Sequence, residues 1–256
     1  MVAAAPRARA ILVSGASGGV GRGIAIACGA AGYEVWIAAR REREASAVAD
    51  EVTAAGGRGR FVACDVGDAA SVAQAIATLT AESGGLFGVV HNATSGLSPL
   101  SKPAQEIGVT ELEDHVRVAL RGLYLLARSA HPWLRRSGGS FVVTTSEAGF
   151  EGKRLLSAYA MVKAAQRGMI RVLAREWGPD GIRVNAIAPL ASTPALAQAF
   201  ASDPSMKDRV LGRNPLGRLG DATDDIGSVV RFLLGDDARY VTGQTVMVDG
   251  GSCPVV

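Results

Sequence analysis

The chain alternates short, continuously apolar runs with longer segments of helical periodicity over its whole length. The expected strands span residues 10–14, 34–39, 60–66, 87–93, 140–146, 182–189 and 244–251, and the expected helices 19–31, 41–56, 69–82, 110–136, 157–178 and 223–234. Continuous apolar strands are typical of a parallel sheet that is buried on both faces. The sequence therefore predicts an α/β fold: a single doubly wound, Rossmann-type domain over residues 1–256. It has a seven-stranded parallel sheet with helices on both faces.

The longest stretch without a clear period lies at residues 190–222. Long connections in compact domains usually serve as binding loops or lids. The apolar side chains of this stretch are Leu190, Leu196, Phe200, Met206 and Leu211. We interpret it as a substrate-binding loop or lid within the single domain, and its composition favours a moderately apolar small-molecule substrate.

The composition excludes several classes of partner. The 256 residues include 20% charged side chains and carry a formal net charge of +3, with lysine and arginine scattered along the chain. This pattern lacks the basic stripe of a nucleic-acid-binding protein. No run approaches the roughly 20 apolar residues of a membrane span. We expect neither a nucleic acid nor a membrane as partner.

The cysteines and histidines form no recognisable motif. Cys28, Cys64 and Cys253 have no disulfide or metal-binding spacing, and the first residues do not resemble a signal peptide. Unpaired cysteines are typical of a reducing compartment, so we expect a cytoplasmic protein. The histidines at positions 91, 115 and 131 show no metal-ligand spacing. We predict no metal site and interpret all three as structural.

Residues 10–25 read AILVSGASGGVGRGIA, with five glycines between an apolar run and a helical pattern. Glycine is costly inside regular structure, so such a cluster needs a specific role. It forms either a tight turn from strand to helix or a loop that brings backbone N–H groups and a helix N-terminus close to a phosphate. The position after the first strand of an α/β alternation favours a dinucleotide-binding loop that contains Gly15, Gly19 and Gly21.

The end of the second expected strand reads AARRERE. Folds that prefer NAD place an acidic residue there, on the ribose 2′-hydroxyl, whereas Ala39 stands at that position here. Arg40 and Arg41 follow, and a guanidinium binds a 2′-phosphate through charge-assisted hydrogen bonds. The pattern favours NADP(H) over NAD(H), with Arg40 as the first candidate and Arg41 as its substitute. The alternative is a solvated, charged start to a helix.

The segment SAYAMVK contains Tyr159 and Lys163, four residues apart on one face of an expected helix. A free phenol has a pKa near 10 and is a poor acid at neutral pH. One ammonium about 4 Å away, at an effective dielectric constant near 20, supplies about 4 kcal/mol, which lowers the phenol pKa by about 3 units. The pair is therefore suited to proton transfer. Taken alone, this spacing also fits an ordinary surface pair.

Together these features resemble the short-chain dehydrogenase/reductase family, including its 3-oxoacyl-reductase-like members, over essentially the whole chain. SGASGGVG resembles the family loop T-G-x-x-x-G-x-G, CDV its aspartate after the third strand, and HNAT its N-N-A-G segment. Ser146 lies thirteen residues before Tyr159, which is the usual separation in the family. RVNAIAP and VTGQTVMVDGG are also similar to family segments.

The resemblance implies a role for each matching residue. Tyr159 would donate a proton to a substrate carbonyl, Ser146 would hold the carbonyl oxygen, and Lys163 would lower the pKa of Tyr159 and bind the nicotinamide ribose. Asp65 would bind the adenine, and Asn92 would line the cofactor cleft. The complete implied cofactor-binding set is Ser14, Gly15, Ser17, Gly19, Val20, Gly21, Arg40, Arg41, Asp65, Val66, Asn92, Ala93, Tyr159, Lys163, Pro189 and Thr193.

The chain also departs from the family pattern. Ala119 stands where the family has a catalytic asparagine, which is thought to hold a water that links the lysine to solvent. His91 and Thr94 replace the first asparagine and the glycine of N-N-A-G, and Leu190 replaces the glycine after Pro189. We expect the proton relay to be rebuilt beside Ala119 by another polar group or by an extra water.

The expected function is an NADP(H)-dependent oxidoreductase that transfers hydride between nicotinamide and a ketone or secondary alcohol. The alternative is a nucleotide-cofactor-binding protein with little or no turnover, which the alanine at position 119 would favour. The resemblance also implies a homotetramer, or a dimer, that assembles through the fourth and fifth helices. We expect apolar residues on more than one face of these helices: Leu120, Leu123, Leu125, Leu126, Met161, Met169 and Leu173.

Overall fold

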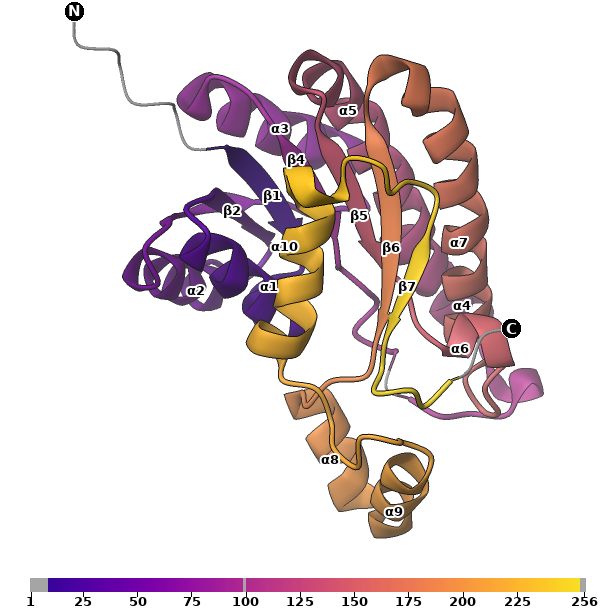
Figure 1. Ribbon diagram of the computed structural model, residues 1–256. Coiled ribbons are helices and arrows are strands. Elements are labelled where there is room, and N and C mark those ends of the chain that lie inside the picture. The colour runs from indigo at the N-terminus through magenta and orange to yellow at the C-terminus, as the bar shows by residue number, and fades with distance from the viewer. Residues whose placement is uncertain (1–8, 99, 254–256) are drawn as a thin grey trace, which may run out of the picture.

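The computed structural model describes residues 9–98 and 100–253 and has one seven-stranded sheet in which every strand pair is parallel (Figure 1). The strands are β1 (Ala10–Ser14), β2 (Glu34–Ala39), β3 (Arg58–Ala63), β4 (Gly88–His91), β5 (Ser140–Thr144), β6 (Arg183–Pro189) and β7 (Thr245–Val248). Their order in space is β3-β2-β1-β4-β5-β6-β7, so the order of connection reverses between β1 and β4. Such a reversal opens a crevice at the carboxyl ends of the two strands. The predicted fold class and sheet are confirmed.

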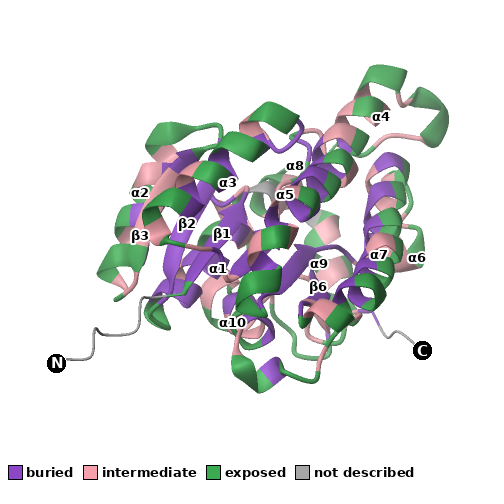
Figure 2. Cartoon of the chain, turned by 90° about the horizontal axis from the view of Figure 1, so that it is seen from above, coloured by how far each residue is buried: buried purple, intermediate pink, exposed green. Residues whose placement is uncertain are grey.

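Helices cover both faces of the sheet, and each set buries its own apolar cluster. On one face lie α1 (Gly19–Ala30), α2 (Glu42–Ala54) and α10 (Ser228–Leu234), and on the other α3 (Ala69–Ser83), α5 (Gly122–Ser137) and α7 (Ser157–Trp177). Ile24 and Val230 belong to the first cluster, and Trp36 and Leu123 to the second. Figure 2 shows the buried strands between helices whose outer faces are exposed. Burial on both faces explains why the strands are continuously apolar.

Several strands are shorter than the apolar runs indicate. The runs 60–66, 87–93 and 140–146 end as strands at Ala63, His91 and Thr144. The next residues turn away because their polar groups bond locally: Asp65 Oδ1 accepts from the Gly67 N–H, and Ser146 Oγ accepts from the Ala148 N–H. The carboxyl edge of the sheet is therefore rich in polar groups that do not belong to the ladder.

The expected helix 110–136 is interrupted by a wider turn. It consists of α4 (Val109–His115), the π-helical stretch η2 (Val116–Arg121) and α5, which follow each other directly. A π-helical stretch displaces the normal hydrogen-bond ladder and occurs often at functional sites. Ala119 lies inside η2 and is fully buried. A second π-helical stretch, η4 (Ala222–Gly227), begins the helix that was expected at 223–234.

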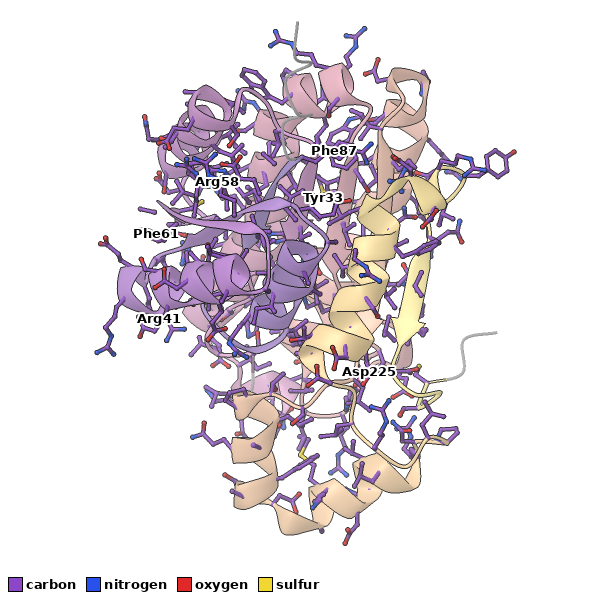
Figure 3. All side chains as sticks on the ribbon, turned by 60° about the vertical axis from the view of Figure 1, so that its left-hand side comes forward. Tyr33, Arg41, Arg58, Phe61, Phe87 and Asp225 are labelled. Atoms are coloured by element: carbon purple, nitrogen blue, oxygen red, sulfur yellow. The ribbon has the colours of Figure 1, made fainter. Side chains whose placement is uncertain are left out.

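The sequence suggested an irregular segment at residues 190–222. The structure instead contains two helices there, α8 (Pro194–Ser202) and α9 (Pro204–Gly212). Thr193 caps α8 by accepting the Leu196 N–H, and each helix has proline in its first turn, where no donor is lost. Both helices lie beyond the lower edge of the sheet in Figure 1. Arg218 pairs with Asp225 (labelled in Figure 3), which fixes the end of the segment to η4.

The remaining elements are single turns: η1 (Ala104–Glu106), α6 (Ala148–Glu151), η3 (Gly178–Asp180) and η5 (Asp236–Ala238). Cys28, Cys64 and Cys253 are all unpaired and buried. Within residues 9–98 and 100–253, no helix combines the length and apolar character that a membrane crossing requires.

Asn185 of β6 fixes the last connection of the sheet. Its side chain is fully buried, donates to the Val241 carbonyl over 2.8 Å and accepts from the Gln244 N–H over 3.1 Å. Asn185→Ala leaves both backbone groups without this partner, so we expect the free energy of unfolding to fall by about 2–4 kcal/mol. Urea denaturation measures the loss, with the surface change Gln74→Ala as a control. A loss below about 1 kcal/mol, the net worth of one ordinary hydrogen bond, would contradict this reading of Asn185.

Candidate active site

The glycine loop joins β1 to α1 at the crevice where the strand order reverses. Gly15 and Gly19 have φ angles of +66° and +55°, which favour glycine. A Cβ atom on Gly15 would lie 2.7 Å from Ala93 Cα, and one on Gly21 would lie 2.6 Å from Asn92 Nδ2. The loop therefore needs glycine both for its backbone conformation and for its close approach to the residues that follow β4.

Hydrogen bonds connect the glycine loop to the end of β4. Ser14 Oγ accepts from the N–H groups of Asn92 and Ala93 over 3.2 and 3.3 Å, and Asn92 Nδ2 donates to the Gly15 carbonyl over 3.0 Å. The N-cap residue of α1 is Gly18, so no side chain of that residue caps the first N–H groups of the helix. This open cradle of backbone donors fits the pyrophosphate of a dinucleotide. Val20 packs from the first turn of α1 against the core.

Arg41 lies beside the glycine loop. Its Nη2 donates to Ser17 Oγ over 2.9 Å, and it occupies the N-cap position of α2 without a side-chain capping bond; Figure 3 labels it. Arg40 is exposed, and Ala39 is buried at the end of β2. Of the two arginines that the sequence singled out, Arg41 is the one whose side chain contacts the glycine loop.

Asp65 follows β3 and is held by Arg117, a residue that the sequence analysis did not single out. The Asp65 carboxylate accepts from Arg117 Nη1 over 3.1 Å and from the Gly67 N–H over 2.9 Å. Arg117 lies on η2 and also donates to Asp114 over 3.2 Å. Val66 is buried beside Asp65. No local pattern reveals the Asp65–Arg117 pair, because the two residues are 52 positions apart.

Tyr159 and Lys163 lie on one face of α7, as their spacing predicts. Lys163 is 2% exposed, its Nζ donates to the Thr144 carbonyl over 2.7 Å, and it lies 5.5 Å from the centre of the Tyr159 ring. Burial lowers the pKa of Lys163 to about 7. Burial also raises the pKa of Tyr159 to about 12, although the Ser146 hydroxyl opposes this rise. The expected lowering of the phenol pKa is absent, because desolvation outweighs any attraction from an ammonium that is itself costly to keep charged.

Ser146 is hydrogen-bonded to the carboxylate of Glu147, a residue that the sequence analysis did not single out. Its Oγ donates to Glu147 Oε2 over 2.8 Å, and Lys153 Nζ donates to Glu147 Oε1 over 2.7 Å. Burial would raise the pKa of Glu147, but the Lys153 ammonium and the bonds from Lys153 and Ser146 outweigh burial and hold it below its ordinary value. The Ser146 hydroxyl therefore donates to Glu147.

A cavity of about 1150 Å³ opens beside Glu147, between the sheet edge and the helices α8 and α9. Its apolar lining includes Leu100, Leu155, Leu156, Leu190, Met206 and Val210. Ion pairs of Glu147 with Lys153, Glu151 with Arg213 and Asp203 with Arg209 also line it. The segment 190–222 thus supplies one wall of a partly apolar chamber.

Pro189 and Thr193 complete the edge on the side of β6. Pro189 ends β6 in register with Val248 of β7. Thr193 reaches over the glycine loop, since a Cβ atom on Gly19 would lie 4.0 Å from Thr193 Cγ2. Loop, α7 and cavity therefore meet at one edge of the sheet. The glycine loop, Asp65, Asn92 and Ser146 all follow the carboxyl ends of strands at this edge, and Arg40, which follows β2, is exposed.

Comparison with known proteins shows the family of this chain. Residues 15–252 match the family model described as enoyl-(acyl carrier protein) reductase. A tropinone reductase homolog of Arabidopsis thaliana is 32% identical over 246 residues, covering 96% of this chain and 91% of the relative. The 3-oxoacyl-(acyl-carrier-protein) reductase FabG of Staphylococcus aureus is 33% identical over 245 residues, covering 95% and 97%. The chain belongs to the short-chain dehydrogenase/reductase family of oxidoreductases.

A solved structure shows the same fold. The 3-ketoacyl-(acyl-carrier-protein) reductase of Brucella melitensis, complexed with NADH, has a TM-score of 0.87 and is 28% identical to this chain. The alignment covers 96% of this chain and 98% of the Brucella chain. The likeness therefore extends over the whole sheet and both helical layers.

The buried ammonium of Lys163 predicts a pH dependence of stability. Its folded pKa of about 7 lies below the unfolded value near 10.4, so between these values the unfolded chain binds more protons and stability rises with pH. This rise is at most about 1.4 kcal/mol per pH unit and disappears in Lys163→Met. Urea unfolding of the cofactor-free protein at about pH 7 and about pH 9 measures it. The same pH dependence in both proteins would show that Lys163 does not titrate in this range.

Proposed function

We propose that this protein is an NADP(H)-dependent reductase that transfers hydride between nicotinamide and a ketone or secondary alcohol of moderately apolar character. One observation carries the proposal: the glycine cradle and the group Ser146, Tyr159 and Lys163 lie at the same carboxyl edge, beside a chamber of about 1150 Å³. The relatives support it, because their names are those of carbonyl reductases. They lend no support to the alternative of a cofactor-binding protein with little turnover.

In this proposal the chain's own residues bind, orient and supply the proton. The glycine loop and the first turn of α1 hold the pyrophosphate through backbone N–H groups. When bound, the nicotinamide supplies the hydride. Tyr159 donates its phenolic proton to the substrate oxygen, and Lys163, at 5.5 Å from the Tyr159 ring, favours the phenolate that remains. Ser146 holds the same oxygen once its O–H turns from Glu147 toward the substrate. The apolar walls exclude water from the reacting group.

The role of Tyr159 is tested by removing only its hydroxyl. Tyr159→Phe keeps the ring but removes the transferable proton, so we expect kcat to fall by at least about a hundredfold. Affinity for NADPH should stay nearly unchanged. NADPH oxidation over a panel of ketones gives the rate, and a fluorescence titration gives the affinity. Substantial residual turnover would mean that another group supplies the proton.

The choice of NADP(H) rests on the arginines after β2. Ala39 carries no carboxylate that would repel a 2′-phosphate, and Arg41 is already directed to Ser17 of the glycine loop. We therefore assign the phosphate contact to Arg41 before Arg40, reversing the order that the sequence suggested. The NADH complex describes the Brucella relative alone. For this chain, the preference for NADP(H) is argued from the two arginines.

Two alanine variants separate the arginines. Arg41→Ala should weaken NADPH binding about 10- to 100-fold, since a charge-assisted contact is worth about 1.5–3 kcal/mol. Arg40→Ala serves as the matched control and should have a smaller effect. NADH binding should change little in either variant. Equal affinity of the unmodified protein for NADH and NADPH would refute the NADP(H) assignment.

Assembly and location complete the proposal. Most of the leucines expected at a subunit interface are part of the core instead, because Leu123, Leu125, Leu126 and Leu173 belong to a buried apolar cluster. Large apolar side chains that remain exposed near or on α5 and α7 include Val116, Tyr124, Met161 and Val172. We propose that these helices form the interface of a homotetramer or dimer in the cytoplasm.

A further inference from the structure

His91 occupies the centre of the sheet at the end of β4. It is fully buried and pairs in register with Ser14 of β1 on one side and Val143 of β5 on the other. An imidazole without solvent contact needs partners for both ring nitrogens, since an unpaired buried polar group costs about 1–3 kcal/mol. Both nitrogens have one.

The partners determine how the proton of the ring is placed. Nε2 lies 3.2 Å from the Ala119 carbonyl, which can only accept, so Nε2 carries the hydrogen. Burial, with the charge of Lys163, lowers the pKa of His91 to about 3, so the ring is neutral. Nδ1 is then an acceptor and receives the hydroxyl proton of Ser14 over 3.2 Å. Ser14 Oγ remains free to accept the N–H groups of Asn92 and Ala93.

The Ala119 carbonyl extends this chain of bonds to the helix that carries Tyr159 and Lys163. Gln166 lies on α7, three residues after Lys163, and is fully buried. Its Nε2 donates to the Ala119 carbonyl over 3.1 Å. The carbonyl of the π-helical stretch η2 thus receives two side-chain donors, one from the sheet and one from α7. Because the side chain of Ala119 is a methyl group, the residue takes part in this network through its backbone carbonyl.

We propose that His91 is a positioning residue that holds the glycine loop at a fixed distance from α7, with one ring nitrogen assigned to each end. Nδ1 fixes Ser14, and through it the loop and the residues after β4. Nε2 fixes the Ala119 carbonyl, and through Gln166 the helix that presents Tyr159 and Lys163. A planar ring transmits position between its two nitrogens because it has no internal rotation. The consequence for turnover rests on the proposed reductase function, whereas the bonding pattern does not.

Two amide variants test the two ends separately. In His91→Gln the amide nitrogen reaches the position of Nε2 and keeps the donor to Ala119, but the acceptor for Ser14 is lost. In His91→Asn the amide oxygen lies near the position of Nδ1 and keeps the acceptor, but the donor to Ala119 is lost. We expect kcat of H91Q to exceed that of H91N by at least about tenfold, the equivalent of about one hydrogen bond. For NADPH affinity the order should reverse, with H91N binding more tightly than H91Q.

The control is His131→Gln, since His131 pairs with Asp180 outside this network and should shift neither quantity. Thermal unfolding of all variants in the presence of NADPH shows whether each is folded. A general loss of structure would lower kcat and NADPH affinity together in both variants, and that result would overturn the proposal. Equal kcat and equal affinity in H91Q and H91N would overturn it as well.

A measurement on the unmodified protein is independent of turnover. Nitrogen-15 NMR of the labelled imidazole near neutral pH should show a neutral ring protonated at Nε2. A ring protonated at Nδ1, or a charged ring, would overturn the proposal even if the enzyme is active. Conversely, a protein that binds NADPH but reduces no ketone would remove the proposed function, while the NMR signature and the affinity order would still decide the role of His91.

Discussion

The structure depends on the contact between two chain segments at the point where the sheet reverses its order. Ser14 ends β1, and Asn92 and Ala93 follow β4; the Ser14 hydroxyl accepts both backbone N–H groups, and Asn92 returns a bond to the Gly15 carbonyl. These bonds join the two segments, and no side chain of the N-cap residue Gly18 occupies the first N–H groups of α1. Only glycine at positions 15 and 21 permits the approach, since a Cβ atom there would meet its neighbours at 2.7 and 2.6 Å. The cofactor cradle is thus a product of sheet topology and of missing side chains.

Burial decides the chemistry of the ionisable groups around the crevice. Desolvation moves Lys163 and Tyr159 in opposite directions, to pKa values of about 7 and about 12, because it disfavours the charged form of each. At neutral pH Tyr159 is therefore uncharged, and Lys163 is close to the midpoint of its titration. Glu147 is the exception, since Lys153 and Ser146 keep it ionised. The serine that would bind the substrate oxygen is consequently engaged before any substrate arrives.

Two of the departures from the family pattern, His91 and Ala119, are connected to each other. His91 and Ala119 are separated by 28 residues but share a hydrogen bond, and Gln166 joins them from α7. His91 and Gln166 both donate to the carbonyl of residue 119. The expectation that a polar group or an extra water rebuilds the proton relay beside Ala119 stays a prediction. Ala119 lies inside the π-helical stretch η2, so this stretch presents the carbonyl that both donors reach.

The sequence by itself determined the alternation of strands and helices, the parallel sheet, the glycine loop and the facing pair Tyr159 and Lys163. Each of these is a local pattern, readable from composition or spacing over a few residues. It misjudged residues 194–212, since two nine-residue helices show too little periodicity, although Thr193 and the prolines at 194 and 204 are helix-start signals. Only the tertiary structure decided how the buried polar groups are partnered: His91 with Ala119, Asp65 with Arg117, and Gln166 with η2. The physical reason is that these bonds join residues 28 to 52 positions apart across a π-helical stretch, and no local pattern encodes them.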